Sequence, residues 1–527
     1  MKKFLYSICI FIAAAGCSII EEDPRDQKPE TEIITDETSL YLTTLGNLYS
    51  LFGSNETGSG LMGTYRGIYD LNTFTTDEAI IPTRGGDWYD GGLWQRLFLH
   101  SWETGEAPLK NAWNYLYKVI VSANQALETL STHRNLLSNS DYTAWQAEIR
   151  AVRAMYYYYL CDMFGRVPLV TSPNVEMANV EQSKRSEVFS FVKKELEESA
   201  PLLFDGRSNT KGKYYGRMTK PVAYYLLAKL CLEASVYLDD NWTDDLHPDT
   251  GRYLDEALAW CNLLDGYYSI EPSYPDNFSV YNENSVENIL TIPMEKQEYS
   301  AQFQYIFRSL HYDHAAACGM SGENGASATL EALEANGFGT GNEDPRFTLN
   351  YWGGQALGLD GSPVYLSSGA PLAYKPLSIK LDLTGSADEK LAGARMKKYA
   401  IDPNGMKDGK LVGNDIVLFR YADVVLMKAE ILVRKGLDGT SLVNQVRTRV
   451  GAEPLDKATL DDILRERMVE FAWEGLRRQD LVRFGSFTRS WSSRPALSGE
   501  SNGYTTVFPI PADVLALNPK MSQNPGY

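Results

Sequence analysis

The segment from Thr76 to Trp94 combines aromatic and charged side chains with four glycines. Glycines at that density indicate a loop. Sugar recognition needs a flat aromatic face for the C–H side of a pyranose ring, together with carboxylate and guanidinium groups that bridge neighbouring hydroxyls. The side chains in this loop that meet those requirements are Asp77, Arg84, Asp87, Trp88 and Tyr89. The sequence therefore predicts a glycan-binding loop in which Trp88 stacks on a sugar ring; the alternative is that Trp88 and Trp94 fill the core.

Two further candidates, Asn324 and Trp352, lie in a central region, residues 239–414, that is rich in Gly, Asn, Ser and Pro. Loops held by a rigid scaffold commonly carry binding residues. We therefore expect Asn324 and Trp352 to add an amide and a second aromatic face to the site. For Trp352, packing in the core is the alternative.

Residues that could perform catalysis are sparse. The chain has five histidines, and the only close pair is His311 and His314. Their spacing suits a metal ion, but neither an HExxH pattern nor an obvious third ligand accompanies them. The run Gly319-Met320-Ser321-Gly322 lacks the spacing of a nucleophile elbow. We expect no catalytic residue, no metal and no cofactor, and hence a binding protein rather than an enzyme.

Composition narrows the class of ligand. The 527 residues carry a formal net charge of −18, which disfavours nucleic acid as a partner. The 33 tyrosines and ten tryptophans offer flat faces suited both to helix packing and to stacking on sugars. Beyond the N-terminal region the cysteines are Cys161, Cys231, Cys261 and Cys318. Because no CxxC spacing occurs, buried free thiols are predicted, and a disulfide between Cys231 and Cys261 is the alternative.

The first 16 residues have the pattern of a lipoprotein signal peptide. Lys2 and Lys3 precede an apolar run, residues 4–15, that is too short to cross a bilayer as a helix, and small residues stand directly before Cys17. We expect cleavage before Cys17, acylation of Cys17, and a polar, flexible tether over residues 17–30. An ordinary secretory signal with an incidental cysteine is the alternative.

Helical periodicity dominates both halves of the remaining chain. The predicted helices span residues 109–130, 142–164, 186–203, 219–238, 252–264, 328–335, 421–435, 441–449 and 459–475. The last begins with a capping box of Thr459 and Asp462 and is expected to end at Gly475. We predict one mostly α domain over residues 31–527. In it, helix pairs over 31–238 and 415–527 form a scaffold for a loop-rich insertion over 239–414 that carries the binding site.

Charged residues near the C-terminus are spaced three or four positions apart, as linked ion pairs on helices require. They are Arg465, Arg467, Glu470, Glu474, Arg477 and Asp480. We interpret them as structural. Arg447 and Arg449 are expected to pair with interior carboxylates, because the guanidinium fork suits that geometry.

Several ordered segments resemble the SusD/RagB family of outer-membrane nutrient-binding lipoproteins. They are residues 150–156 (RAVRAMY), 162–169 (DMFGRVPL), 217–224 (RMTKPVAY), 420–424 (RYADV), 444–449 (NQVRTR), 473–477 (WEGLR), 508–511 (FPIP) and 523–527 (QNPGY). Each segment alone is a weak signal. Together they cover almost the whole chain that follows the signal peptide.

This resemblance implies a scaffold of TPR-like helix pairs, a glycan site in the loops that follow a segment like Thr75–Ile80, and no catalytic activity. It also implies a lipid anchor that holds the protein at the cell surface of the outer membrane, and a SusC-like TonB-dependent transporter as partner. The family's glycan contacts vary with the substrate, so the site residues above rest on their chemistry. Two alternatives stay open: a RagB-like protein that binds peptides, and a lipoprotein hydrolase.

Overall fold

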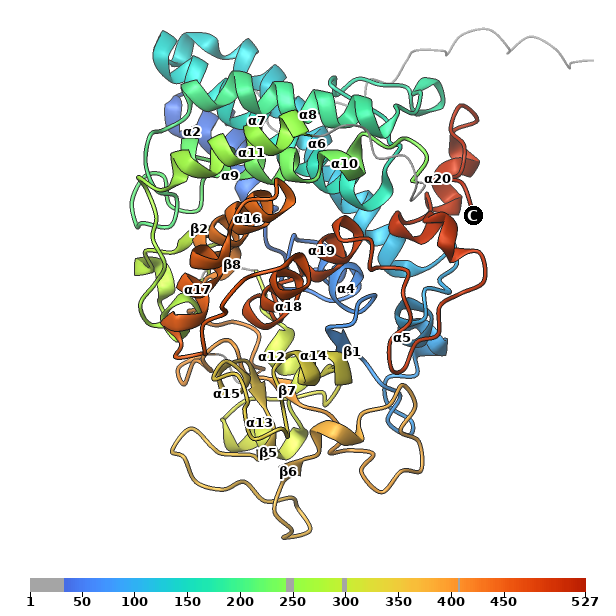
Figure 1. Cartoon of the computed structure of the whole chain (residues 1–527). Coiled ribbons are helices and arrows are strands. Elements are labelled where there is room, and N and C mark those ends of the chain that lie inside the picture. The colour runs from blue at the N-terminus through green and yellow to red at the C-terminus, as the bar shows by residue number, and fades with distance from the viewer. Residues whose placement is uncertain (1–32, 243–250, 296–300, 406–407) are drawn as a thin grey trace, which may run out of the picture.

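The computed structural model describes residues 33–242, 251–295, 301–405 and 408–527. Helices fill the upper part of the molecule in Figure 1, and short strands and loops form the lower part. The expected signal peptide, Cys17 and the tether lie outside the described residues. Within the described ranges, no helix is both long enough and apolar enough to cross a membrane.

The long helices of the first half pack side by side, as the predicted helix pairs require. The layer consists of α6 (Ala107–Thr132), α7 (Asn139–Phe164), α8 (Arg185–Ser199), α9 (Lys220–Leu232) and α11 (Gly251–Leu264). Helix α7 contacts both α6 and α8, and α9 contacts α11. Pro108 stands in the first turn of α6, where a missing N–H costs nothing, and Ser138 caps α7 by accepting a hydrogen bond from the Asp141 N–H.

The C-terminal helices complete the scaffold. They are α16 (Tyr421–Arg434), α17 (Thr440–Arg449), α18 (Leu460–Glu470), α19 (Arg477–Arg483) and α20 (Ala512–Leu517). Helix α16 packs against α9 and α11 on one side and against α17 and α18 on the other, so residues far apart in sequence share one hydrophobic core (Figure 1). The mostly helical class predicted from the sequence is confirmed. All four cysteines in the described ranges are buried free thiols, as predicted.

Two predicted helices are interrupted where a buried acidic residue takes a tertiary partner. The capping box at Thr459 is present, but α18 ends at Glu470, and the predicted end at Gly475 is wrong. Trp473 adopts a left-handed conformation (φ 66°), and its N–H donates to Glu78 at 2.7 Å instead of continuing the helix. The helix predicted over 219–238 divides into α9 and α10 (Ala234–Tyr237) at Glu233, whose carboxylate pairs with Arg483.

Short elements surround the scaffold. At the N-terminal side lie α2 (Glu37–Tyr41), α3 (Asn47–Ser50), α4 (Ile68–Thr73) and α5 (Leu93–Phe98). Between α11 and α16 lie β2 (Asn288–Ile292), α12 (Tyr305–Ser309), α13 (Tyr312–Ala317), β3 (Ser327–Ala328), α14 (Leu330–Ala335), α15 (Phe347–Asn350), β4 (Tyr351–Trp352), β5 (Gly354–Gln355), β6 (Ala373–Tyr374), β7 (Arg395–Met396) and β8 (Ile416–Arg420).

These strands form two-stranded antiparallel ladders, of which β4 with β7 and β5 with β6 lie within the central region. Strand β1 (Ala79–Ile80) pairs with β3, which ties the predicted binding loop to the central region. Strand β2 pairs with β8, which closes the central region at its two ends. Although α11 falls within residues 239–414, it packs on α9 and α16 as part of the helical layer.

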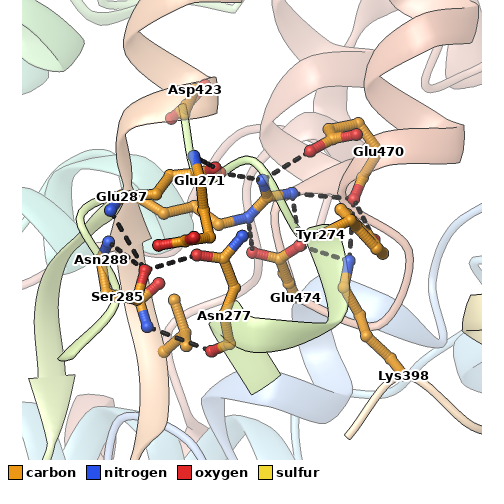
Figure 2. Close-up of polar contacts among 12 residues, drawn as sticks. Glu271, Tyr274, Asn277, Ser285, Glu287, Asn288, Lys398, Asp423, Glu470 and Glu474 are labelled. Carbon is orange, nitrogen blue, oxygen red and sulfur yellow. Dashed lines mark hydrogen bonds and ion pairs between the residues drawn. The ribbon is translucent and has the colours of Figure 1, made fainter. Parts of the chain in front are cut away.

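A buried network of ion pairs joins β8, α17 and α18 to the central region. Figure 2 shows the part of it that contains Glu287, Glu470, Glu474 and Lys398. The Arg420 guanidinium donates to Glu287 and Glu470, each at 2.6 Å, and to Glu474 at 2.7 Å. Arg449 bridges Glu287 at 2.9 Å and Glu470 at 2.5 Å, and Lys398 pairs with Glu474. The interior role predicted for Arg449 is confirmed. Because every one of these charges is removed from water, the network needs all of its partners.

Candidate functional site

One surface pocket gathers side chains from three separate stretches of the chain. It has a volume of about 380 Å³, and it lies where the loop before α4, the loop before α5 and helix α13 meet. Its lining residues are Tyr65, Arg66, Gly86, Asp87, Trp88, Asp90, Tyr312 and Glu323. The pocket therefore contains two of the predicted site residues, Asp87 and Trp88, together with two tyrosines and further charged groups.

Three of the lining residues hold an unusual backbone conformation. Arg66, Trp88 and Asp90 have φ angles of 61°, 62° and 42°, in the left-handed region that side chains with a Cβ rarely adopt. Such conformations cost roughly 1–3 kcal/mol each and persist where the surrounding structure imposes them, commonly at functional sites. All three of these residues line the same pocket.

Trp88 is half-buried and is held on several sides. Its indole N–H donates to the Glu323 carbonyl at 2.9 Å, and its ring meets the buried Trp94 edge to face, with centroids 6.0 Å apart. On another side it lies against Gly325, where an added Cβ would come within 2.6 Å of two ring carbons. The absence of a side chain at Gly325 thus permits the position of Trp88, which is preorganised before any ligand arrives.

The two aspartates of the pocket are each occupied on one carboxylate oxygen only. Asp87 Oδ2 accepts from the Tyr312 hydroxyl and from Lys390 Nζ, both at 2.8 Å. Asp90 Oδ2 accepts from Arg66 at 2.9 Å and from the Trp94 indole N–H at 2.8 Å. Among the residues that the structure describes, neither Oδ1 accepts a side-chain or backbone hydrogen bond. Each aspartate can therefore accept one from a ligand hydroxyl.

Electrostatics keep Asp87 ionised. The hydrogen bond from Lys390, followed by that from Tyr312, lowers the pKa of Asp87 below its usual value. Burial, followed by the hydrogen bond to Asp87, raises the pKa of Tyr312 to about 12, so this hydroxyl stays a donor at neutral pH. Burial also raises the pKa of Glu323 above its usual value.

Two predicted site residues, Arg84 and Asn324, lie buried beneath the pocket instead of lining it. Arg84 donates to the carbonyls of Glu389 and Ala392 and to Ser327, at 2.8 to 2.9 Å. Asn324 accepts from Arg395 at 2.9 Å and donates to the Lys390 carbonyl at 3.0 Å. Burial holds the pKa of Arg84 well below its ordinary value and lowers that of Arg395 to about 10.

The remaining predicted residues do not line this pocket. Asp77 forms a bidentate ion pair with Arg477 of α19, at 2.7 and 2.8 Å, and borders a separate hollow beside α18. The Tyr89 side chain is 54 % exposed and follows Trp88 directly. Trp352 is half-buried in β4, where Lys397 Nζ lies 4.5 Å from its ring centroid. Of the seven predicted residues, the pocket brings together Asp87 and Trp88.

The histidine pair considered as a metal site has other partners. His314 contacts the Tyr374 hydroxyl at 2.9 Å and the Leu357 carbonyl at 3.1 Å, and burial lowers the pKa of both His311 and His314 to about 4. Within the described ranges no group of three or more His, Cys, Asp or Glu side chains is arranged to hold a metal ion.

Four lining residues lie outside the loop that the sequence singled out: Tyr65, Arg66, Tyr312 and Glu323. A signal was present for the first two, because the segment from Gly58 to Gly67 carries four glycines around an aromatic and a basic residue. That composition matches the one that singled out the loop at Trp88. Tyr312 and Glu323 carried no comparable signal, since their place depends on how α13 packs.

The fold is that of SusD-like proteins. Solved structures with the same fold include surface glycan-binding protein A from Bacteroides thetaiotaomicron in complex with laminarihexaose (TM-score 0.71, 19% identity, 93% of this chain and 100% of that chain). A laminarin binding SusD-like protein also has this fold (TM-score 0.70, 22% identity, 94% and 100%).

Sequence comparison identifies the family. Residues 382–527 match the SusD family, and residues 65–232 match the family described as starch-binding associating with outer membrane. The chain is 25% identical over 509 residues to the starch-binding protein SusD of Bacteroides thetaiotaomicron, covering 89% of this chain and 86% of that protein. It is also 25% identical over 432 residues to a SusD-like protein of Bacteroides ovatus, covering 79% and 73%. Both regions match models of SusD-type proteins, so the resemblance to the SusD/RagB family predicted from the sequence is confirmed.

Proposed function

We propose that this protein is a surface lipoprotein that binds a glycan in the pocket around Trp88 and catalyses no reaction on it. The observation that carries the proposal is the convergence of three residues with left-handed backbones, Arg66, Trp88 and Asp90, on a single open pocket. Aromatic faces beside ionised acceptors are what a pyranose ring requires. The relatives named for starch and laminarin binding support the same ligand class.

The predicted residues take two roles in this proposal. Asp87 and Trp88 contact the sugar, and the exposed Tyr89 borders the bound chain. Asp77, Arg84 and Asn324 hold the loop in place through the partners described above. Trp352 is proposed as a contact only for a ligand that extends beyond the pocket.

Calorimetric titration with a panel of soluble glycans tests the proposal. The panel comprises a β-1,3-glucan, a β-1,4-glucan, maltooligosaccharides, xylan and mannan, with a mixture of peptides from casein as the alternative ligand. Binding of at least one glycan, with no shorter products after long incubation, is expected. Binding of the peptides alone favours the RagB-like reading, and release of shorter sugars overturns the absence of catalysis.

A pair of glycine variants locates the site within that experiment. Gly325→Ala places a methyl group against the Trp88 ring and should weaken glycan binding roughly tenfold, which corresponds to about 1.4 kcal/mol. Gly266→Ala is the control, because an added Cβ there meets no atom within 4 Å and Gly266 is distant in sequence from every residue that lines the pocket. Equal affinity for both variants, with both folded, places the glycan elsewhere.

We further propose that Cys17 carries the lipid anchor at the outer membrane and that a SusC-like TonB-dependent transporter receives the glycan. Acyl chains on one cysteine would anchor the protein without a membrane-spanning helix. Cys17→Ala should release the folded protein from the membrane fraction unless the transporter retains it. Affinity purification from detergent-solubilised membranes should recover the transporter with the wild-type protein, and its absence from the eluate argues against the partnership.

A further inference from the structure

The charged residues at the pocket around Trp88 bear on whether the bound glycan is neutral or anionic. The aromatic residues do not distinguish the two. Among the residues that the structure describes, three acidic residues line the pocket, Asp87, Asp90 and Glu323, whereas the only basic lining residue is Arg66. Lys390 stands next to Asp87. Each of these two cations faces an aspartate at 2.8 or 2.9 Å, Lys390 on Asp87 and Arg66 on Asp90.

We infer that the pocket selects neutral, hydroxyl-rich glycans and rejects glycans with carboxylate or sulfate groups at the bound sugar. This inference rests on the proposed function and names the ligand class of the same site. A hydroxyl can donate to the free Oδ1 of Asp87 or Asp90, whereas an anionic group can only accept. Two acceptors in contact repel, and a like charge at a partly desolvated site costs several kcal/mol.

The buried arginines beneath the pocket do not reverse this preference. Arg84 and Arg395 are fully buried, and their described hydrogen bonds go to carbonyls, Ser327 and Asn324. Because both guanidinium groups are buried, including the Nε of each, which has no partner among the described residues, they offset part of the negative charge without reaching a ligand at the pocket surface. A ligand at the pocket surface would therefore contact carboxylate oxygens and cations that are already paired with aspartates.

Glu323 adds to the selection from a different segment of the chain. It belongs to the loop after α13, and its backbone carbonyl receives the Trp88 indole N–H at 2.9 Å. The charged groups that face its carboxylate are Arg308, Lys410, Arg66 and Asp90. Arg308 is itself paired with the buried Asp70 at 2.9 Å, and Arg66 is paired with Asp90. Two of the three cations near Glu323 are thus already matched.

The test compares one glycan in two charge states. The neutral glucan that binds most tightly in the panel is titrated beside the same glucan after oxidation of its primary alcohols to carboxylates, using the full-length mature protein at low and high salt. We expect the oxidised form to bind at least about tenfold more weakly. The difference in affinity should be smaller at high salt, because salt screens the repulsion between like charges.

A variant ties that difference to the pocket. Asp87→Asn keeps the shape of the side chain and removes its charge, so it should narrow the gap between the two glucans about threefold or more. Glu181→Gln is the matched control, because it makes the same charge change on a side chain that is 80 % exposed and outside the pocket. Melting curves establish that both variants are folded.

The outcomes separate the two proposals. Equal or tighter binding of the oxidised glucan overturns the inference while glycan binding stands. An unchanged gap in a folded Asp87→Asn protein also overturns the assignment of the selection to this pocket. If no glycan in the panel binds in either form, the proposed function itself fails, and the inference fails with it.

Discussion

The buried network around Arg420 and the pocket around Trp88 use the same chemistry, basic side chains paired with carboxylates, in opposite ways. In the network, both oxygens of Glu470 are occupied: Oε1 accepts from Arg420 and Arg449, and Oε2 accepts from Arg346 at 2.9 Å. In the pocket, Asp87 and Asp90 each receive two donors on Oδ2 alone. The first arrangement saturates its acceptors, and the second leaves one free.

Burial explains why the two regions differ. A carboxylate with an unpaired oxygen in the protein interior would lose the hydrogen bonds of water without replacement, so complete pairing is required there. The side chains of Asp87 and Lys390 are 45 % and 41 % exposed, and water satisfies what the protein does not. A free acceptor at the surface is therefore tolerated, and it is also the feature that a ligand can use.

The largest effect is expected in the buried network, where both oxygens of a carboxylate accept hydrogen bonds from arginines. Glu470→Gln removes one negative charge shared by Arg346, Arg420 and Arg449 and should destabilise the protein by about 3–5 kcal/mol in chemical denaturation. Asp461→Asn, an exposed change on the same helix, is the control and should cost less than about 1 kcal/mol. A similar loss of stability in the two variants would show that the buried network contributes no more to stability than an exposed charge does.

A second prediction concerns pH and the buried Glu78, which accepts the Trp473 N–H at 2.7 Å. Burial raises the pKa of Glu78 to about 8, so the folded protein retains a proton that the unfolded chain releases above about pH 4.5. Stability is thus fully present below pH 4.5 and should fall as pH rises toward 8, by up to about 1.4 kcal/mol per pH unit from this group.

Glu78→Gln sharpens this prediction, because the amide keeps the acceptor oxygen and cannot ionise. Denaturation curves at a series of pH values from 5 to 9 should show a flatter profile for Glu78→Gln than for the wild type. Parallel profiles would contradict a raised pKa at Glu78.

A third prediction compares two neighbouring tryptophans across the boundary between core and pocket. Trp94→Ala should cost about 3–5 kcal/mol of stability, since its side chain is buried. Trp88→Ala should cost less and should weaken glycan binding by about 1–2 kcal/mol, which is roughly tenfold. Calorimetric titration and melting curves on both variants measure this. Equal loss of stability, with unchanged glycan affinity in Trp88→Ala, would assign Trp88 to the core.

The smallest effect on stability is expected at the exposed ion pair between Lys390 and Asp87. Lys390→Gln breaks the contact with Asp87 and should change stability by less than about 1 kcal/mol, because exposed ion pairs contribute little. Denaturation under the conditions used for Glu470→Gln gives the direct comparison. A loss as large as that of Glu470→Gln would show that the pocket pair is structural.

Much of the helical scaffold could be predicted from the sequence, because amphipathic periodicity and caps are local. The helix expected over 109–130 is α6, and that expected over 142–164 is α7. The prediction that the last long helix ends at Gly475 failed, since α18 ends at Glu470 and the Trp473 N–H donates to a carboxylate 395 positions away. Contacts of that kind leave no trace in the local pattern.

The candidate site was predicted only in part, for a related reason. Residue chemistry identified the glycine-rich loop with Asp87 and Trp88, but it also selected Arg84 and Asn324, which the structure buries together. Polar side chains that can bind sugars can equally bind carbonyls, and sequence alone does not distinguish exposed from buried donors. Tyr312 entered the pocket through the packing of α13.

By itself, then, the sequence determined the helix-pair class, the resemblance to the SusD/RagB family and one candidate binding loop, because those depend on periodicity, motif order and composition. Only the tertiary structure decided which charged residues saturate one another in the interior and which keep an acceptor free at the surface. The physical reason is that desolvation depends on what covers a side chain, and that cover comes from residues distant in the chain.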